Sequence, residues 1–176
     1  IGSREDALAI ARLGHETYAA IGDLPVPSFA FVNGAVMGGG VELALACTYR
    51  TMSAGVPAVA LPECFLGLVP GWGGCWMLPN LIGLVPALKV IIENPLSNNR
   101  MLTGPQAAKL GMADVLLAPA DFLTESVRWA AGVLTGAVTV ERAEIERDEQ
   151  AWEGAVAAAR AQVEAKTGGA APAPLR

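Results

Sequence analysis

Residues 28–47 read SFAFVNGAVMGGGVELALAC, and this stretch decides the fold. Residues 28–32 are apolar and rich in strand-forming types, and Asn33 and Gly34 end the run, so we predict a buried strand there. Three consecutive glycines at 38–40 then open an apolar helix. Because strand, glycine turn and helix follow each other here and again further along the chain, we expect an α/β fold.

Helix and strand signals flank this stretch on both sides. Ser3 and Asp6 have capping-box spacing and begin a helix that we expect to end near Gly22. Thr103 and Gln106 repeat the capping-box pattern. We expect strands over 58–61 and 114–118, and helices over 86–93, 103–111 and 121–134, the last capped by Asp121.

Composition divides the chain into three parts. Residues 1–136 are expected to form the core domain. Residues 137–166 are rich in charge but keep a helical stripe of apolar side chains, so we expect a C-terminal helical segment there. The stripe consists of Val140, Ile145, Trp152, Val156 and Val163. Residues 167–176 have the glycine, alanine and proline content of a linker or tail.

Bulk composition argues against several classes of protein. The 176 residues suffice for one domain, and 53% of them are hydrophobic against 16% charged, which argues against disorder. A net charge of −5 argues against a nucleic-acid partner, and no apolar run reaches the roughly 18–20 residues of a membrane span. The three cysteines lack CxxC spacing, so we expect free thiols in a reducing compartment, the cytoplasm, and no metal site. The single histidine, His15, excludes a His-based triad unless it is itself the base.

The glycines at 38–40 are the first candidate site. Glycines let the backbone approach a ligand closely, and the free N–H groups of a helix N-terminus attract negative charge. The pattern indicates an anion or oxyanion site, unless the glycines only allow the helix to pack against its strand. A P-loop is excluded because no Gly-Lys-Ser/Thr follows, and the acidic residue of a dinucleotide site is missing from the end of a second strand.

Two isolated carboxylates are the second candidate. Glu42 is the only charge in VELALAC, residues 41–47, and Glu63 follows Pro62 and precedes an apolar run. Apolar surroundings raise a carboxyl pKa towards the value that a general acid or base needs, and two carboxylates in different environments divide these duties. The alternatives are that Glu42 is a partner of the helix dipole and that Glu63 is a solvated turn residue.

Two further residues have open interpretations. PGWGG, residues 70–74, is punctuated by proline and glycine as structural loops are, and Trp72 within it either lines an apolar channel or fills the core. Cys47 has no base or cation beside it in the sequence, so we expect it in the core.

Three segments together resemble the crotonase, or enoyl-CoA hydratase/isomerase, superfamily over roughly residues 25 to 120. They are VPSFAFVNGAVMGGGVELALAC (26–47), LPECFLGLVPGWGGCWMLPNLIG (61–83) and MLTGPQAAKLGMADVLL (101–117). NPLSNNRMLTG and PADFLTESVRWAAG are similar to the hydratase domain of the multifunctional fatty-acid β-oxidation α chain. The resemblance implies a crotonase-like ββα spiral core followed by C-terminal helices.

The resemblance also implies a set of site residues. Gly39 would carry an oxyanion-hole N–H, and Glu42 and Glu63 would be the two catalytic glutamates. Gly71, in the PG dipeptide, would lie near the reacting water, and we take Gly71 and Trp72 as the candidate substrate-binding residues. The implied enzyme is a lyase that adds water across the double bond of a 2-enoyl-CoA thioester in fatty-acid β-oxidation, and it needs no cofactor because the substrate carries coenzyme A.

Implied partners are the acyl-CoA substrate and either further copies of the chain or a thiolase subunit. The family's first oxyanion donor lies in an A-x-x-A-D-like segment upstream of residue 1, so we expect a core that is incomplete at its N-terminus. The stretch between the two glutamates is one residue longer than usual, at Val56 and Pro57. Two alternatives stay open: a Δ3,Δ2-enoyl-CoA isomerase, which needs only the Glu63-type acid/base, and a non-catalytic acyl-CoA-binding fragment.

Overall fold

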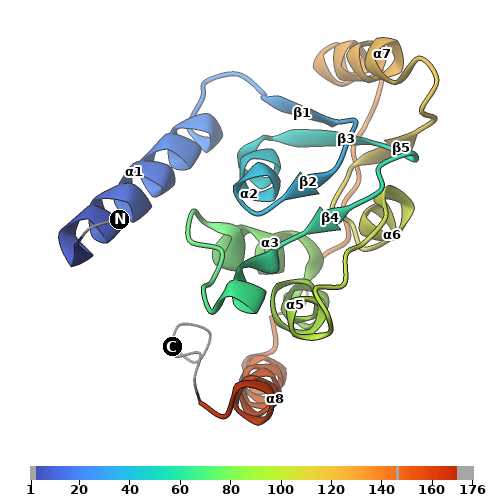
Figure 1. Ribbon diagram of the computed structural model, residues 1–176. Coiled ribbons are helices and arrows are strands. Elements are labelled where there is room, and N and C mark those ends of the chain that lie inside the picture. Colours follow the sequence, from blue (N-terminus) through green and yellow to red (C-terminus); the bar gives the residue numbers. More distant parts are fainter. Residues whose placement is uncertain (1–2, 146, 170–176) are drawn as a thin grey trace.

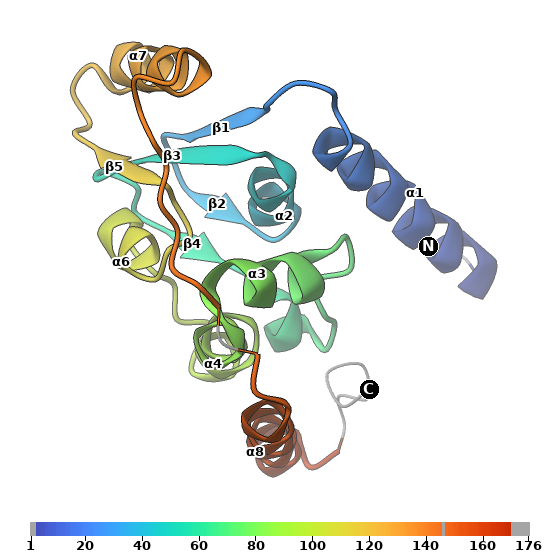
Figure 2. The same cartoon turned by 180° about the vertical axis from the view of Figure 1, so that it is seen from behind.

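The computed structural model describes residues 3–145 and 147–169 (Figure 1). Its first helix, α1 (Arg4–Gly22), begins at Ser3, whose hydroxyl accepts a hydrogen bond from the Asp6 N–H at 3.1 Å. The predicted capping signal and helix end are therefore confirmed. In both views the first half of α1 projects beyond the body of the molecule, and its second half runs past α2 (Gly39–Ala46) (Figures 1 and 2).

The described part of the chain holds two parallel sheets. One has the strand order β1-β3-β5, with β1 at Phe29–Val32, β3 at Tyr49–Ser53 and β5 at Val115–Leu117. The other pairs β2 (Val36–Met37) with β4 (Val59–Ala60). The chain alternates between the two sheets and turns into a helix after β2 and after β4. This ββα spiral confirms the predicted fold class.

The central strand β3 was not predicted, because its sequence YRTMS is largely polar. Several of its buried polar groups have tertiary partners that sequence periodicity does not reveal, although Nε of Arg50 is buried without a partner among the described residues. Thr51 is fully buried, and its hydroxyl lies 2.7 Å from that of Ser126. Val56 and Pro57, where the resemblance implies one additional residue, lie in the turn after β3; Val56 is buried and its N–H donates to the Ser53 carbonyl at 3.0 Å.

Helices occupy most of the rest of the chain. They are the 3₁₀ helix η1 (Pro62–Leu66), α3 (Gly74–Ile82), α4 (Leu84–Leu88), the π-helical turn η2 (Lys89–Glu93), α5 (Asn94–Leu96), α6 (Gly104–Lys109), α7 (Phe122–Leu134) and α8 (Glu149–Thr167). The helix expected over 86–93 exists as part of α4 and η2, and α6 starts at the predicted capping box. Helix α3 was missed because its glycine opening and internal Pro79 are typical of a loop.

Three sequence expectations are wrong in part. Asp121 precedes α7 as predicted, but it has a left-handed φ of 58° and makes no side-chain cap. Val140 and Ile145 lie in an irregular strap before α8, which runs down the body between α7 and α8 in Figure 2. Cys47 is half-buried and not in the core. The boundary at 136–137 stays a prediction, and 170–176 of the expected tail lie outside the described residues.

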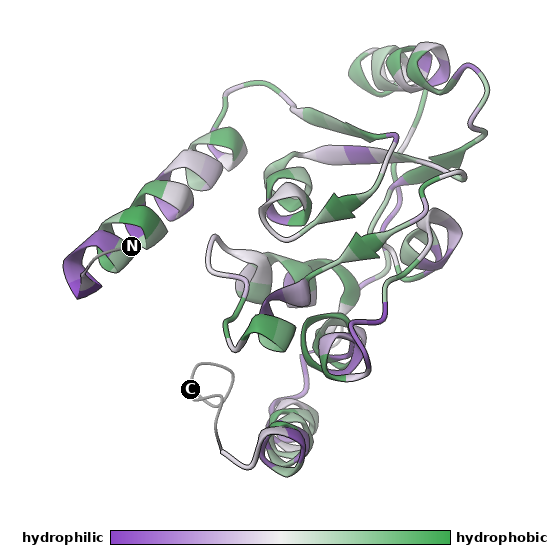
Figure 3. Ribbon diagram, viewed as in Figure 1, coloured by the Kyte–Doolittle hydropathy of each residue, from purple (hydrophilic) through white to green (hydrophobic). Residues whose placement is uncertain are grey.

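The core lies between the two sheets and helices α2 to α6. Leu61 and Leu78 are fully buried, and Val41, Val59 and Val90 are at most 3% exposed. Figure 3 shows β2 and β4 as apolar throughout, and β4 is fully buried, whereas Met37 of β2 is exposed. No helix in the described part of the chain is long and apolar enough to span a membrane.

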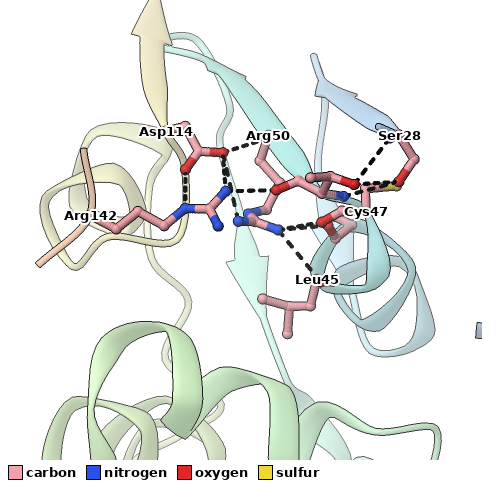
Figure 4. A network of polar contacts seen from close by, with 8 residues as sticks. Ser28, Leu45, Cys47, Arg50, Asp114 and Arg142 are labelled. Atoms are coloured by element: carbon pink, nitrogen blue, oxygen red, sulfur yellow. Dashed lines mark hydrogen bonds and ion pairs between the residues drawn. The ribbon is translucent and has the colours of Figure 1, made fainter. Parts of the chain in front are cut away.

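A buried ion-pair network joins the sheet to the strap (Figure 4). The Asp114 carboxylate accepts from the Arg50 N–H at 2.8 Å and from Nε of Arg142 at 2.7 Å, and it lies 3.6 Å from Nη2 of Arg50. Nη1 of Arg50 donates to the Cys47 carbonyl at 2.7 Å, at the end of α2. The side chains of Arg50 and Asp114 are 4% and 2% exposed. This network fixes the C-terminal end of the helix whose first residue is Gly39.

Asp114→Ala should destabilise the fold strongly. Removing one partner of a buried ion pair leaves the other charge uncompensated, which typically costs about 3–5 kcal/mol. We expect a loss of that size in the free energy of urea unfolding. Glu125→Ala is the matched control, because Glu125 pairs with Arg128 on the surface and such pairs contribute about 0–1 kcal/mol. Equal losses in the two variants would contradict the structural role of the network.

Candidate active site

The glycine turn between β2 and α2 brings the candidate residues together. Gly38 precedes α2 with φ 54° and ψ −127°, a conformation that suits glycine, and its N–H donates to the Ala60 carbonyl at 3.0 Å. The N–H groups of Gly39 and Gly40 find no acceptor among the described residues. Two free backbone donors therefore lie at the N-terminus of α2, where the helix dipole favours negative charge.

Glu42 lies in the first turn of α2 and is 2% exposed. Its Oε1 accepts hydrogen bonds from the N–H of Trp72 at 2.8 Å and from the N–H of Gly74 at 2.9 Å. The PGWGG segment thus holds the carboxylate by its backbone. Glu42 also lies in the first turn of α2, as a partner of the helix dipole would, but it is buried and held by two hydrogen bonds. Gly74 has no room for a side chain, because a Cβ there would lie 3.0 Å from Oε1 and 2.8 Å from Cβ of Pro70.

Glu63 lies in η1 and faces the same glycine turn. Its Oε1 is 2.9 Å from the position that a Cβ on Gly38 would occupy, and its Oε2 is buried without a partner among the described residues. Burial raises the pKa of Glu63 above its ordinary value, and the charge of Glu42 raises it further, although a backbone hydrogen bond opposes the shift. Glu63 is therefore not a solvated turn residue, and its environment differs from that of Glu42.

Trp72 lies between α1 and the start of α2. A Cβ on Gly39 would be 2.9 Å from Cζ3 of the indole, so the ring packs directly against this glycine. Tyr18 of α1 meets the indole edge-on at 5.5 Å between centroids, and its hydroxyl donates to the Gly39 carbonyl at 3.1 Å. Burial, and then the charge of Glu42, raise the pKa of Tyr18. Gly71 is exposed and immediately precedes Trp72.

A cleft of about 650 Å³ opens beside this cluster. It is lined by α1, the end of α2 and α3, and Trp72, Trp76 and Met77 give it an apolar wall. Neither glutamate lines it. The described residues contain no group of three or more His, Cys, Asp or Glu side chains suited to a metal ion.

The structure thus brings Gly39, Glu42, Glu63 and Trp72 together around one turn, and exposed Gly71 immediately precedes Trp72. The structure adds Gly38 and Gly74, which leave room for the two carboxylates. It also adds two hydrogen-bond donors: the backbone N–H of Trp72, which donates to Glu42, and the hydroxyl of Tyr18, which donates to the Gly39 carbonyl. Gly38 and Gly74 could have been found from the sequence, because they belong to the glycine clusters beside the two carboxylates. Tyr18 could not have been found, because its contact joins residues that are distant in the sequence.

The parallel ββα spiral with a glycine-opened helix beside two carboxylates defines a crotonase-type domain. A model of the enoyl-CoA hydratase/isomerase family matches residues 4–167, and the chain belongs to this family. The resemblance read from the sequence is therefore confirmed.

Known proteins extend the comparison. The chain is 34% identical over 178 residues to the fatty acid oxidation complex subunit alpha of Shewanella loihica, which covers 97% of this chain and 24% of that protein. The protein of the same name from Vibrio cholerae is 43% identical over 113 residues, covering 64% of this chain and 15% of that protein.

Solved structures agree. An enoyl-CoA hydratase from Bacillus anthracis superposes with a TM-score of 0.67 at 26% identity, covering 76% of this chain and 49% of the other. Pseudomonas aeruginosa DspI superposes with a TM-score of 0.68 at 27% identity, covering 99% and 57%. The chain thus spans a quarter or less of these curated relatives and about half of these solved structures.

Proposed function

We propose that the protein is a lyase that adds water across the double bond of a 2-enoyl-CoA thioester in fatty-acid β-oxidation. The observation that carries this proposal is the pair of unlike carboxylates around one glycine turn. Glu42 is held by two backbone N–H groups, and Glu63 keeps a buried oxygen without a partner among the described residues. An isomerase needs one acid/base group, so a second carboxylate fixed this firmly favours hydration.

The glycine turn would stabilise the charge that develops during the reaction. Addition of water to an enoyl thioester places negative charge on the thioester oxygen, and a backbone N–H aimed at that oxygen stabilises it. We assign the Gly39 N–H to this role, because it is free and lies at a helix N-terminus. Loss of one such donor typically costs about 10²–10³ in rate.

The two glutamates would divide the proton transfers. Glu42 takes a proton from water, whose oxygen forms the bond to the β-carbon, and protonated Glu63 gives its proton to the α-carbon. The proton that Glu42 gained returns to Glu63 before the next turnover. The raised pKa of Glu63 supports the assignment of the acid role to this residue. Each acid or base step contributes roughly 10²–10⁴ in rate.

Substrate contacts, partners and compartment complete the proposal. We propose that Gly71 and Trp72 border the acyl group, since both adjoin the backbone that holds Glu42. The name of the relatives, fatty acid oxidation complex subunit alpha, supports assembly into a complex, and we propose a thiolase subunit or further copies of the chain as partners. The three free cysteines support a cytoplasmic location.

The direct test is hydration of crotonyl-CoA by the full-length gene product. Hydration removes the conjugated double bond, so the ultraviolet absorbance of the enoyl thioester should fall with time. A 3-enoyl-CoA is supplied in a parallel assay, where isomerisation would make this absorbance rise. Isomerisation without hydration would replace the proposed function by the isomerase, and absence of both activities would favour a non-catalytic role.

The raised pKa of Glu63 predicts a pH-dependent stability. Above the ordinary value of 4.5 the unfolded chain has lost a proton that folded Glu63 keeps, so the free energy of unfolding falls as pH rises through this window. Glu63→Gln cannot titrate and removes this contribution. Urea unfolding from about pH 4 to about pH 7 should show wild type losing stability relative to Glu63→Gln as pH rises. The prediction is wrong if the difference in unfolding free energy between wild type and Glu63→Gln does not change with pH. It is also wrong if the control Glu153→Gln, at an exposed residue, shows an equally large pH-dependent difference from wild type.

A further inference from the structure

Helix α1 meets the body of the molecule along one narrow face. Gly14 is the buried residue of α1, and Ala11, Tyr18 and Ile21 on the same face are half-buried. Leu13, one position away, is 64% exposed. Helix α1 therefore packs most closely against the body of the molecule at Gly14.

The side chain that docks there is Trp72. A Cβ built on Gly14 would lie 2.1 Å from both Cδ1 and Nε1 of the indole and 2.5 Å from Cε2. Atoms do not approach this closely, so the indole occupies the space that any other residue at position 14 would fill. Tyr18, one turn further along α1, closes the edge of the same slot at 5.5 Å between ring centroids.

Trp72 and Tyr18 also reach the groups proposed for the reaction. The backbone N–H of Trp72 donates to Oε1 of Glu42 at 2.8 Å, and the indole of Trp72 packs against Gly39. The Tyr18 hydroxyl donates to the Gly39 carbonyl at 3.1 Å. One aromatic residue is thus in contact with α1, with the carboxylate and with the first residue of α2.

We propose that Gly14 and Tyr18 are positioning residues for the reaction. The slot on α1 fixes Trp72, and Trp72 fixes the Glu42 carboxylate and the N-terminus of α2. This inference rests on the proposed function for its catalytic consequence. A methyl group on residue 14 would force the indole or α1 to move by more than about 1 Å, and misplacement of that size from a remote mutation can cost about 10²-fold in rate.

The test is Gly14→Ala in the full-length gene product. We expect kcat for crotonyl-CoA hydration to fall by about 10-fold or more, and KM, which also depends on the acyl contact proposed for Trp72, to change less than kcat does. Gly154→Ala is the matched control. Gly154 also lies inside a long helix, and a Cβ there meets nothing within 4 Å, so this variant should keep wild-type kcat.

A double-mutant cycle shows whether the effect passes through Trp72. In a Trp72→Phe background the smaller ring leaves room at the slot, so Gly14→Ala should cost less than about 3-fold. An equal cost in both backgrounds, or wild-type kcat in folded Gly14→Ala, would overturn the inference. If Gly14→Ala does not fold, Tyr18→Phe provides the test. Wild-type kcat in Tyr18→Phe would exclude a positioning role for Tyr18. Wild-type kcat together with unchanged exchange of the Trp72 and Gly74 backbone amides would overturn the whole inference.

Amide hydrogen exchange gives a readout that does not need activity. The N–H groups of Trp72 and Gly74 are protected by their bonds to Glu42, so they should exchange faster in Gly14→Ala than in wild type or Gly154→Ala. Unchanged exchange would overturn the inference. If the wild-type protein hydrated no enoyl-CoA, the proposed function would fail, yet exchange would still decide whether α1 fixes the contact between Trp72 and Glu42.

Discussion

Glu42→Gln in the full-length gene product should lower kcat for hydration of a short 2-enoyl-CoA by at least about 10²-fold, with KM nearly unchanged. The amide cannot take a proton from water at neutral pH, so the proposed base is lost. The local structure should survive, because the amide oxygen can accept both N–H bonds that Oε1 accepts from Trp72 and Gly74. The comparison therefore isolates proton transfer from the folding of the site.

Steady-state kinetics with crotonyl-CoA measure the effect, and Glu153→Gln on the exposed face of α8 is the control that should leave kcat unchanged. The orientation of the side-chain amide in Glu42→Gln can be verified by the exchange rates of the Trp72 and Gly74 backbone amides. Near-normal hydration by Glu42→Gln would remove Glu42 from the mechanism. Retention of 3-enoyl-CoA isomerisation in the same variant would move the assignment to the isomerase.

The elements with local signals were the ones predicted from the sequence. Helix α1 starts with its own cap at Ser3, and β1 is an apolar run that ends in Asn33 and Gly34. Strand β3 has no such signal, because Arg50 and Thr51 are buried only through partners 64 and 75 residues away. Helix α3 was not predicted because its local sequence argues against a helix: glycine and proline have low helix propensity, so tertiary packing must hold it.

The candidate site shows the same division. Glu42, Glu63 and the glycines at 38–40 could be picked out as candidates because isolated charges and glycine clusters stand out in an apolar sequence, and the family resemblance pointed to Gly39 among the glycines. The way in which Glu42 is held could not be predicted, because its donors are backbone N–H groups 30 and 32 residues downstream. The slot at Gly14 was equally hidden: a single glycine in a helix has many structural explanations, and its contact with Trp72 exists only in the folded chain.

Gly39→Val should lose activity by roughly 10²-fold or more while the fold is retained. The φ of Gly39 is not left-handed, so the requirement for glycine there comes from space and not from backbone strain. A Cβ would lie 2.9 Å from Cζ3 and 3.1 Å from Cε3 of Trp72. The bulkier valine must therefore push away the indole or shift the start of α2, and the N–H proposed to face the thioester oxygen moves with it.

Crotonyl-CoA kinetics and thermal unfolding measure the two halves of this prediction, and Gly34→Val is the control, since a Cβ on Gly34 meets nothing within 4 Å. A folded and fully active Gly39→Val would show that the oxyanion role of this glycine is wrong. Gly39→Ala, made with and without Trp72→Phe, then separates the two causes. Because the smaller ring restores space for the methyl group, activity that returns in the double variant is the part lost through the indole. With Trp72→Phe alone as the reference, activity that stays lost reflects the displaced N–H, whose removal costs about 2.7–4 kcal/mol of transition-state stabilisation in comparable oxyanion holes.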